Sequence, residues 1–220
     1  MTIKANEPFH FFTRLHLSEL TGLRSSNLSE LLELIKTVPG SSIYHHTHRF
    51  LQQHQYLSPE PPNDFAYWVS NVLVEPELGE RLASIDTVHF STIRSLREKI
   101  VDVIEKYLLN NPAAQAKYVR NGAEFHFIKS MSFIMPTNHF AYDLKELAEI
   151  IKKITIDSIY YHVFEARLRL EKGDNDFSVW VENFFGDKKL AAKISRLDPY
   201  TYTMEDLRKT LVKIIEKSIK

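Results

Sequence analysis

The chain has 220 residues, of which 44% are apolar and 25% are charged, and its 28 basic residues balance 28 acidic ones. This composition is ordinary for a globular protein, and a net charge of zero gives no electrostatic reason to expect nucleic acid or an anionic membrane as a partner. The absence of cysteine excludes disulfides and thiolate chemistry, and no apolar run approaches the length of a membrane span. We therefore expect a cytoplasmic protein.

The first half of the chain contains signals for one strand followed by helices. Residues 9–17, FHFFTRLHL, are rich in aromatic and other β-favouring residues, so we expect a strand there. The apolar residues within 28–35 then recur at helical spacing. Four further helices are expected. Three of them should start at Ser41 or Ser42, at Asn63 or Asp64, and near Pro76. The last one carries Leu96, Ile100, Val103, Ile104 and Tyr107.

The second half repeats this pattern in the same order. Five segments recur: FHF at 9 and 125, LSELLELIK at 28 with LKELAEIIK at 144, SIYHH at 42 with SIYYH at 158, NDFAYWV at 63 with NDFSVWV at 175, and SLREKIVDVIEK at 95 with DLRKTLVKIIEK at 206. The first three pairs keep one offset of 116 residues, and two small gaps align the others. So many ordered matches indicate a tandem duplication.

The duplication predicts the domain organisation. We expect one repeat unit over residues 1–110, a linker over 111–122 and a second unit over 123–220, each with one strand and about five helices, packed as one globular body. A single strand cannot satisfy its own backbone groups, so the two strands should pair. The predicted fold class is mainly α with a small antiparallel β element (α+β), in which the internal tandem repeat forms a pseudo-twofold dimer.

Several long motifs resemble a known family. SIYYHVFEARLRL, NDFSVWV and RLDPYTYTMEDLR in the second half, and SSIYHHTHRFLQQHQYLSPEPPNDFAYWV in the first, are similar to a bacterial family known only as domain of unknown function 5752. The resemblance covers almost the whole chain and implies no established activity. Members of that family are often encoded beside glycosyltransferases and other carbohydrate enzymes, so the resemblance implies a carbohydrate-active enzyme as a partner.

SIYHH and SIYYH each end in a histidine, His46 and His162, on a helix face that should turn toward the core. A core histidine needs hydrogen-bond partners, and Tyr44 or Tyr160 of the other half, or a backbone carbonyl, would provide one. Two interpretations stay open. These residues are structural anchors of an interface beside the symmetry axis, or they bind ligand or transfer protons in a cleft between the halves.

His10 and His126 alternate with phenylalanines in the two predicted strands. Solvent-facing positions are the simpler interpretation. In the alternative, they join His46 and His162 in a symmetric four-histidine site for an anion or a divalent metal.

The run HHTH at 45–48 has a spacing that can bind metal, since His45 and His48 lie one turn apart on a helix. The equivalent residues of the second copy are Tyr161 and Phe164, and no carboxylate stands at the spacing used by zinc enzymes. We therefore expect no metal.

Two arginines are candidates for holding a phosphate or a carboxylate. Arg49 aligns with Glu165 in the repeat, and Arg167 follows two residues later. A guanidinium near a cleft would bind such a group with two parallel hydrogen bonds. A solvated or ion-paired helix face explains the same residues.

An Asn-Asp pair recurs at 63–64 and 175–176, each with a tryptophan four residues beyond the aspartate, Trp68 and Trp180. An aspartate beside an aromatic ring can bind sugars. A helix N-cap followed by a buried tryptophan explains the pattern more simply.

The sequence contains no nucleotide-binding glycine motif and no nucleophile elbow, so we expect no cofactor. The favoured hypothesis is a pseudo-dimeric module with a binding or regulatory role, acting with carbohydrate-active enzymes as a monomer or a homo-oligomer. The alternative is an enzyme of an unrecognised class that acts on a phosphorylated or acidic small molecule, using His46 or His162 with an arginine in a cleft between the repeats.

Overall fold

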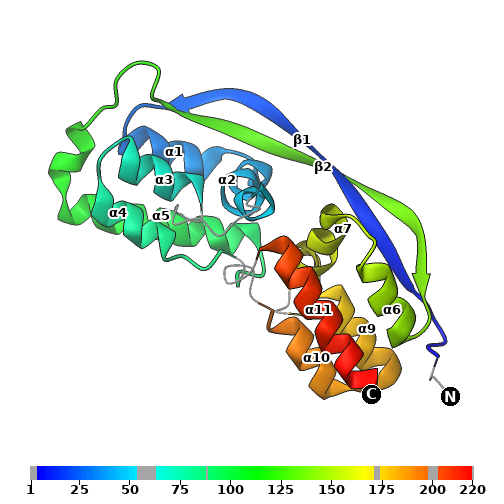
Figure 1. Cartoon of the computed structure of the whole chain (residues 1–220). Helices are drawn as coiled ribbons and strands as arrows, with labels where there is room; N and C mark the ends of the chain where they lie inside the picture. The colour runs from blue at the N-terminus through cyan, green and yellow to red at the C-terminus, as the bar shows by residue number, and fades with distance from the viewer. Residues whose placement is uncertain (1–3, 54–62, 88, 171–173, 198–202, 220) are drawn as a thin grey trace. The chain divides into compact units, whose positions relative to one another are not determined.

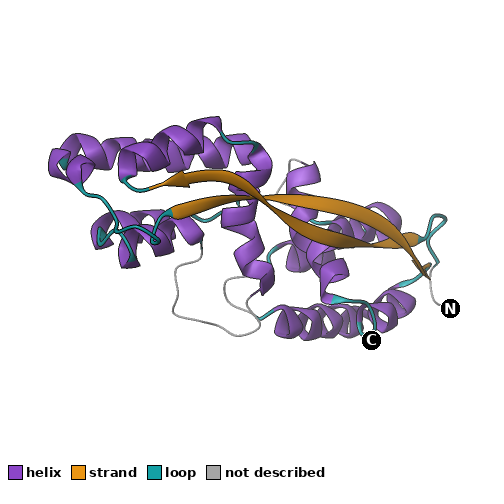
Figure 2. Ribbon diagram, turned by 90° about the horizontal axis from the view of Figure 1, so that it is seen from above, coloured by secondary structure: helices purple, strands orange, loops and turns teal. Residues whose placement is uncertain are grey.

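The structure is a computed structural model of the whole chain, and it describes residues 4–53, 63–87, 89–170, 174–197 and 203–219. Within these residues the structure is mostly helical. Its two long strands pair with each other as a two-stranded antiparallel sheet (Figure 2). The predicted class, mainly α with a small antiparallel β element, is confirmed. The chain forms two compact units, each described here by itself.

Both strands are longer than the sequence predicts. Strand β1 spans Phe9–Ser25 and strand β2 spans Phe125–Ala141, whereas the aromatic-rich signal covers only 9–17 and 125–133. The remaining residues are extended because the strands pair with each other, as cross-strand hydrogen bonds show. Thr21 Oγ1 donates to the Phe127 carbonyl at 2.6 Å, and Thr137 Oγ1 donates to the Phe11 carbonyl at 2.7 Å.

The first compact unit, called the α1–α5 unit, contains described residues within 16–53 and 63–131. Its helices are α1 (Leu28–Thr37), α2 (Gly40–Gln53), α3 (Asp64–Asn71), α4 (Pro76–Ala83), α5 (Ile93–Asn110) and the short 3-10 helix η1 (Pro112–Ala116). The predicted helix starts are confirmed at Asn63, which caps α3, and at Pro76, which opens α4. Figure 1 shows α1, α3, α4 and α5 on one side of the strand pair.

The second compact unit, called the α6–α11 unit, contains described residues within 4–15 and 132–219. Its helices are α6 (Leu144–Ile151), α7 (Ile156–Tyr160), the π-helical segment η2 (Tyr161–Glu165), α8 (Ala166–Leu170), α9 (Asp176–Phe185), α10 (Lys188–Ser195) and α11 (Met204–Ile219). The predicted cap of α11 is present, since Thr203 Oγ1 accepts from the Asp206 backbone N–H. Segments α7, η2 and α8 follow one another directly.

The two strands exchange their first halves between the units. β1 passes from the α6–α11 unit into the α1–α5 unit between Leu15 and His16, and β2 passes the other way between Met131 and Ser132. The early residues of each strand therefore pack on helices far away in sequence. The compact units consequently differ in composition from the contiguous ranges 1–110 and 123–220.

The aromatic residues of the strands show this exchange in both cores. Phe125 and Phe127 belong to the hydrophobic core of the α1–α5 unit, where Phe125 stacks on Phe65 with ring centroids 5.1 Å apart. In the α6–α11 unit, Phe9 stacks on Phe177 at 4.9 Å. Stacked aromatic pairs of this kind add stabilisation beyond the area they bury.

A polar network ties α5 to the turn before α4. Tyr107 Oη donates to the Glu75 carboxylate, which also accepts from Lys117 Nζ at 2.7 Å. Burial, followed by the hydrogen bond to Glu75, raises the pKa of Tyr107 to about 12. Burial alone would raise the pKa of Glu75 as well, but the two donors Lys117 and Tyr107 bring it below its usual value. The network therefore contains a neutral phenol and an ionised carboxylate.

We expect Tyr107 to titrate near pH 12 in an absorbance titration of the folded protein, against an ordinary value of 10.0. Tyr107→Phe removes that component, and Glu75→Gln moves it toward 10. Because folding raises this pKa, its stabilising contribution is complete below pH 10 and is lost between pH 10 and 12. A titration in which Tyr107→Phe changes nothing above pH 11 would contradict the network.

Within the described residues, none of the helices combines the length and the apolar character that a membrane crossing requires.

Candidate functional site

His162 joins a helix to a strand through both of its ring nitrogens. It lies on η2, and only 2% of the residue is exposed. The backbone N–H of Phe12 in β1 donates to its Nε2 at 2.8 Å. Its Nδ1 lies 2.7 Å from Asp176 Oδ2 at the start of α9. The imidazole therefore connects β1, η2 and α9 within the α6–α11 unit.

His46 makes the same two contacts in the α1–α5 unit. The backbone N–H of Ile128 in β2 donates to His46 Nε2 at 3.0 Å, and His46 Nδ1 lies 2.8 Å from Asp64 Oδ2. This residue is also 2% exposed. Residues 12 and 128, like 46 and 162, are separated by 116 positions, which is the offset of the sequence repeat.

These contacts determine the tautomer of both rings. A backbone N–H can only donate, so Nε2 must carry the lone pair and Nδ1 must carry the hydrogen. Nδ1–H then donates to the aspartate. Each ring is neutral and hydrogen-bonded, and its partners are an aspartate and a strand N–H, where the sequence suggested Tyr44, Tyr160 or a carbonyl. An imidazole used in this way has no lone pair left to accept a proton from a substrate.

We expect His162→Leu and His46→Leu to lower the free energy of unfolding by about 1–3 kcal/mol each, because each change leaves a buried strand N–H and an aspartate without this partner. Urea unfolding monitored by circular dichroism measures the effect. His10→Leu, at an exposed position of β1, is the control and should change the stability by less than about 0.5 kcal/mol. Equal effects at all three positions would contradict a structural role.

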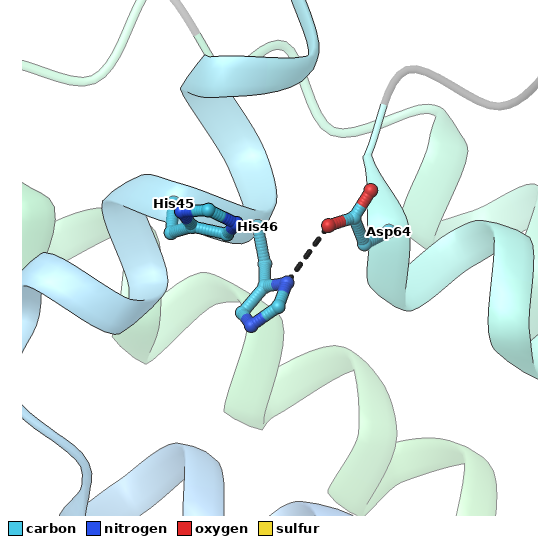
Figure 3. A group of neighbouring side chains, drawn as sticks. All are labelled: His45, His46 and Asp64. Carbon is cyan, nitrogen blue, oxygen red and sulfur yellow. Dashed lines mark hydrogen bonds and ion pairs between the residues drawn. The ribbon is translucent and has the colours of Figure 1, made fainter. Parts of the chain in front are cut away.

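Three potential metal ligands, His45, His46 and Asp64, lie within 4.8 Å of one another (Figure 3). The figure shows the ring of His46 pointing from α2 toward Asp64 at the start of α3, with His45 alongside. His46 Nδ1 carries the hydrogen donated to Asp64, and Nε2 is used by Ile128, so no neutral form of this ring offers a lone pair to a cation. His45 Nδ1 is hydrogen-bonded to Ser130 Oγ at 2.9 Å. These three side chains are therefore better described as a hydrogen-bonded group than as a metal site.

His48, the other member of the HHTH run, is stacked on Tyr44 with ring centroids 5.2 Å apart and hydrogen-bonded to Thr47 Oγ1 at 2.8 Å.

The four repeated histidines are divided between the two units. His10 and His162 belong to the α6–α11 unit, and His46 and His126 belong to the α1–α5 unit. His10 and His126 are exposed on their strands, and the ring of His10 lies edge-on to Phe140 at 4.2 Å. Each unit thus holds one buried histidine and one exposed histidine from this set.

The two candidate residues on η2 and α8 are engaged with protein groups. Glu165 forms an ion pair with Arg14 of β1, whose side chain is fully buried. Arg167 is 5% exposed and donates to the carbonyls of Ser195, at 2.7 Å, and Leu197, at 3.3 Å. The backbone of Arg49 lies in α2, and its side chain is outside the described part of the structure.

Arg14 is a residue that the sequence did not single out. Its guanidinium pairs with Glu165 and lies 4.4 Å from the centre of the Tyr160 ring. Its position five residues after Phe9, in a predicted strand rich in aromatic residues, could have identified it as a charged residue close to the core. The partner could not be inferred, because Glu165 follows 151 residues later.

The Asn-Asp-Trp pattern forms a helix N-cap followed by a buried tryptophan, which is the simpler of its two interpretations. Asn63 caps α3 and Asn175 caps α9 through their side-chain oxygens. Both tryptophans are buried, and their indole N–H groups donate to strand-side carbonyls. Trp68 Nε1 donates to Ala123 at 2.8 Å, and Trp180 Nε1 donates to Glu7 at 3.2 Å.

The α6–α11 unit contains an aromatic pocket of about 400 Å³ beside His162. The residues that line it come from the two positions before β1, from the start of β1, from η2 and from α9: Glu7, Pro8, Phe9, His10, Phe12, Tyr161, His162, Asp176, Val179, Trp180, Asn183 and Phe184. The sequence identified His10 and His162 as candidates, but not the pocket, because its walls are separated by about 150 residues in the chain. Its size is in the range of small-molecule sites.

The comparisons with known proteins agree with this architecture. No curated protein matches the chain. A solved structure, OrfY from Thermoproteus tenax, is similar to it with a TM-score of 0.82 and 30% sequence identity, covering 97% of this chain and 96% of that one. Residues 6–216 match the family of unknown function DUF5752, as the motifs suggested. The chain therefore belongs to this family of unknown function.

Proposed function

We propose that this protein is a non-catalytic binding module that works together with a carbohydrate-active enzyme in the cytoplasm. The observation that carries the proposal is that both ring nitrogens of His46 and of His162 are hydrogen-bonded within the protein, Nε2 to a strand N–H and Nδ1 to an aspartate at the start of a helix. An imidazole whose two nitrogens are both hydrogen-bonded to protein groups is unsuited to proton transfer. The absence of cysteine supports a reducing compartment.

The enzyme alternative requires an arginine beside one of these histidines to hold a phosphorylated or acidic substrate. Arg167 instead donates to the carbonyls of Ser195 and Leu197. The pocket beside His162 is lined by two acidic residues, Glu7 and Asp176, and by no lysine or arginine among the described residues, which disfavours an anionic ligand. Both observations favour binding over this chemistry.

Matched contacts in the two units support a duplicated, pseudo-twofold origin. The aspartate–histidine–strand arrangement, the stacked phenylalanines and the tryptophan-to-carbonyl bond recur at equivalent positions. We propose that the chain is a monomer with internal symmetry of this kind, or a homo-oligomer built from it. The association with a carbohydrate-active enzyme depends on the gene neighbourhoods of the family.

The first test asks whether the protein turns over any substrate. Purified protein is incubated with sugar phosphates, nucleotide sugars and sugar acids, and their consumption is followed by proton and phosphorus NMR. We expect no consumption. Consumption that disappears in a folded His162→Gln variant would establish the enzyme alternative.

The second test asks whether the partner exists. The protein is mixed with the purified glycosyltransferase encoded nearest to its own gene, and complex formation is followed by analytical ultracentrifugation. We expect a complex of defined stoichiometry. Independent sedimentation of the two proteins would remove the proposed association.

A further inference from the structure

We propose that the aromatic pocket of the α6–α11 unit binds a small organic cation, of the alkylammonium or quaternary ammonium class. The inference rests on the proposed binding function and specifies its ligand. Three features of the pocket lead to this inference. They are the acidic residues in its lining, its aromatic residues, and the hydrogen bond that holds Asp176.

The charge of the lining favours a cation. Two acidic residues, Glu7 and Asp176, line the pocket, and no lysine or arginine is found among the described residues that line it. His162 contributes no positive charge, because its Nε2 accepts the Phe12 N–H and its Nδ1–H donates to Asp176. The two acidic residues therefore favour an ammonium group over a phosphate or a carboxylate as the ligand.

The lining is also rich in aromatic rings. Phe9, Phe12, Tyr161, Trp180 and Phe184 all contribute to it. Aromatic faces attract cations through their quadrupoles, and clusters of such rings are the usual means of recognising alkylated ammonium groups, whose methyl groups also bury apolar surface. An acidic residue beside several aromatic rings therefore favours an alkylated ammonium group, which carries apolar methyl groups, over a hydrated metal ion.

Asp176 is held in place for this role. Its Oδ2 accepts from His162, whose ring is in turn held by the backbone of β1. The side chain retains 18% exposure. A carboxylate held by a buried histidine is already in position and loses little freedom when a ligand binds.

The equivalent positions of the α1–α5 unit have a different chemistry. In the repeat alignment Glu7 corresponds to Ala123, Phe12 to Ile128, Tyr161 to His45 and Phe184 to Val72. Three aromatic rings and one carboxylate are therefore replaced at these positions. The inference consequently predicts one cation per chain.

Isothermal titration calorimetry with choline tests the inference, with its uncharged carbon analogue 3,3-dimethyl-1-butanol as the matched control ligand. We expect choline to bind with a stoichiometry of one and the uncharged analogue to bind at least about fivefold more weakly. Glu7→Gln and Phe184→Ala should each weaken choline binding by about threefold to tenfold. Asn71→Ala, at the exposed position of α3 that corresponds to Asn183, should leave it unchanged.

Circular dichroism of each variant establishes that it is folded before the titration is interpreted. The inference is overturned if choline does not bind, if the uncharged analogue binds equally well, or if both pocket variants bind as the parent does. These outcomes leave the proposed function standing, since a module can bind another ligand. Substrate turnover in the NMR experiment would instead overturn the proposed function while choline binding could still be measured.

Discussion

Trp180→Ala is expected to lower the free energy of unfolding by about 3–5 kcal/mol, the usual cost of emptying a large buried aromatic position. The indole is 6% exposed, lies 5.0 Å from the Phe185 ring and 5.8 Å from the Phe9 ring, and donates to the Glu7 carbonyl. Its loss therefore removes packing on both the helix and the strand. Urea unfolding monitored by circular dichroism measures the change.

Trp68→Ala should have an effect of the same size. Trp68 is 5% exposed, lies 5.9 Å from the Phe125 ring and donates to the Ala123 carbonyl. Trp68→Phe and Trp180→Phe are the controls, because they keep a ring and lose the hydrogen bond, and they should cost less than the alanine variants. Losses below about 1 kcal/mol for both alanine variants would show that these residues do not stabilise the cores.

Glu165→Gln is expected to lower the free energy of unfolding by about 3 kcal/mol, because it removes the charge of a carboxylate that forms an ion pair with the buried guanidinium of Arg14. The Arg14 side chain has 0% exposure and the Glu165 side chain 17%. The double variant Arg14→Met with Glu165→Met should lie within about 1 kcal/mol of the parent, since an apolar pair of similar volume avoids the cost of burying charge. A double-mutant cycle from urea unfolding separates the two results.

The exposed pair Lys106–Asp102 on α5 is the control for this cycle. Its side chains are 66% and 41% exposed, so Asp102→Asn should cost less than about 0.5 kcal/mol. A Glu165→Gln variant as stable as Asp102→Asn would show that the Arg14–Glu165 pair contributes no more than a surface pair.

Local chemistry made much of the fold predictable. Asn63 and Pro76 indicate helix starts through capping and backbone geometry, which depend on a few neighbouring residues. The pairing of the two strands also followed, because a lone strand leaves its backbone groups unsatisfied. The second half of each strand was missed, since its extended conformation depends on the partner strand and not on its own composition.

The candidate site was harder to predict, because its contacts are long-range. The helical pattern placed His46 and His162 on buried faces, and both are buried. Their partners on the strands could not be inferred, since Phe12 lies 150 residues from His162. The spacing of apolar residues predicts helices and strands, but it does not predict that the first half of each strand packs in a different unit from the second half. The pocket arises from this exchange and was missed for the same reason.

The strand exchange also sets the order in which a growing chain can complete its cores. The α1–α5 unit needs nothing beyond Met131, so it can close while the ribosome is still adding residues. Phe9 and Phe11 are synthesised before the α1–α5 unit but must wait for Phe177 on α9. At 5–20 residues per second, the 46 residues between positions 131 and 177 take roughly 2–9 seconds to synthesise. For that interval the start of β1 still has no core to enter after the α1–α5 unit has closed, and it would be the natural binding site for a chaperone.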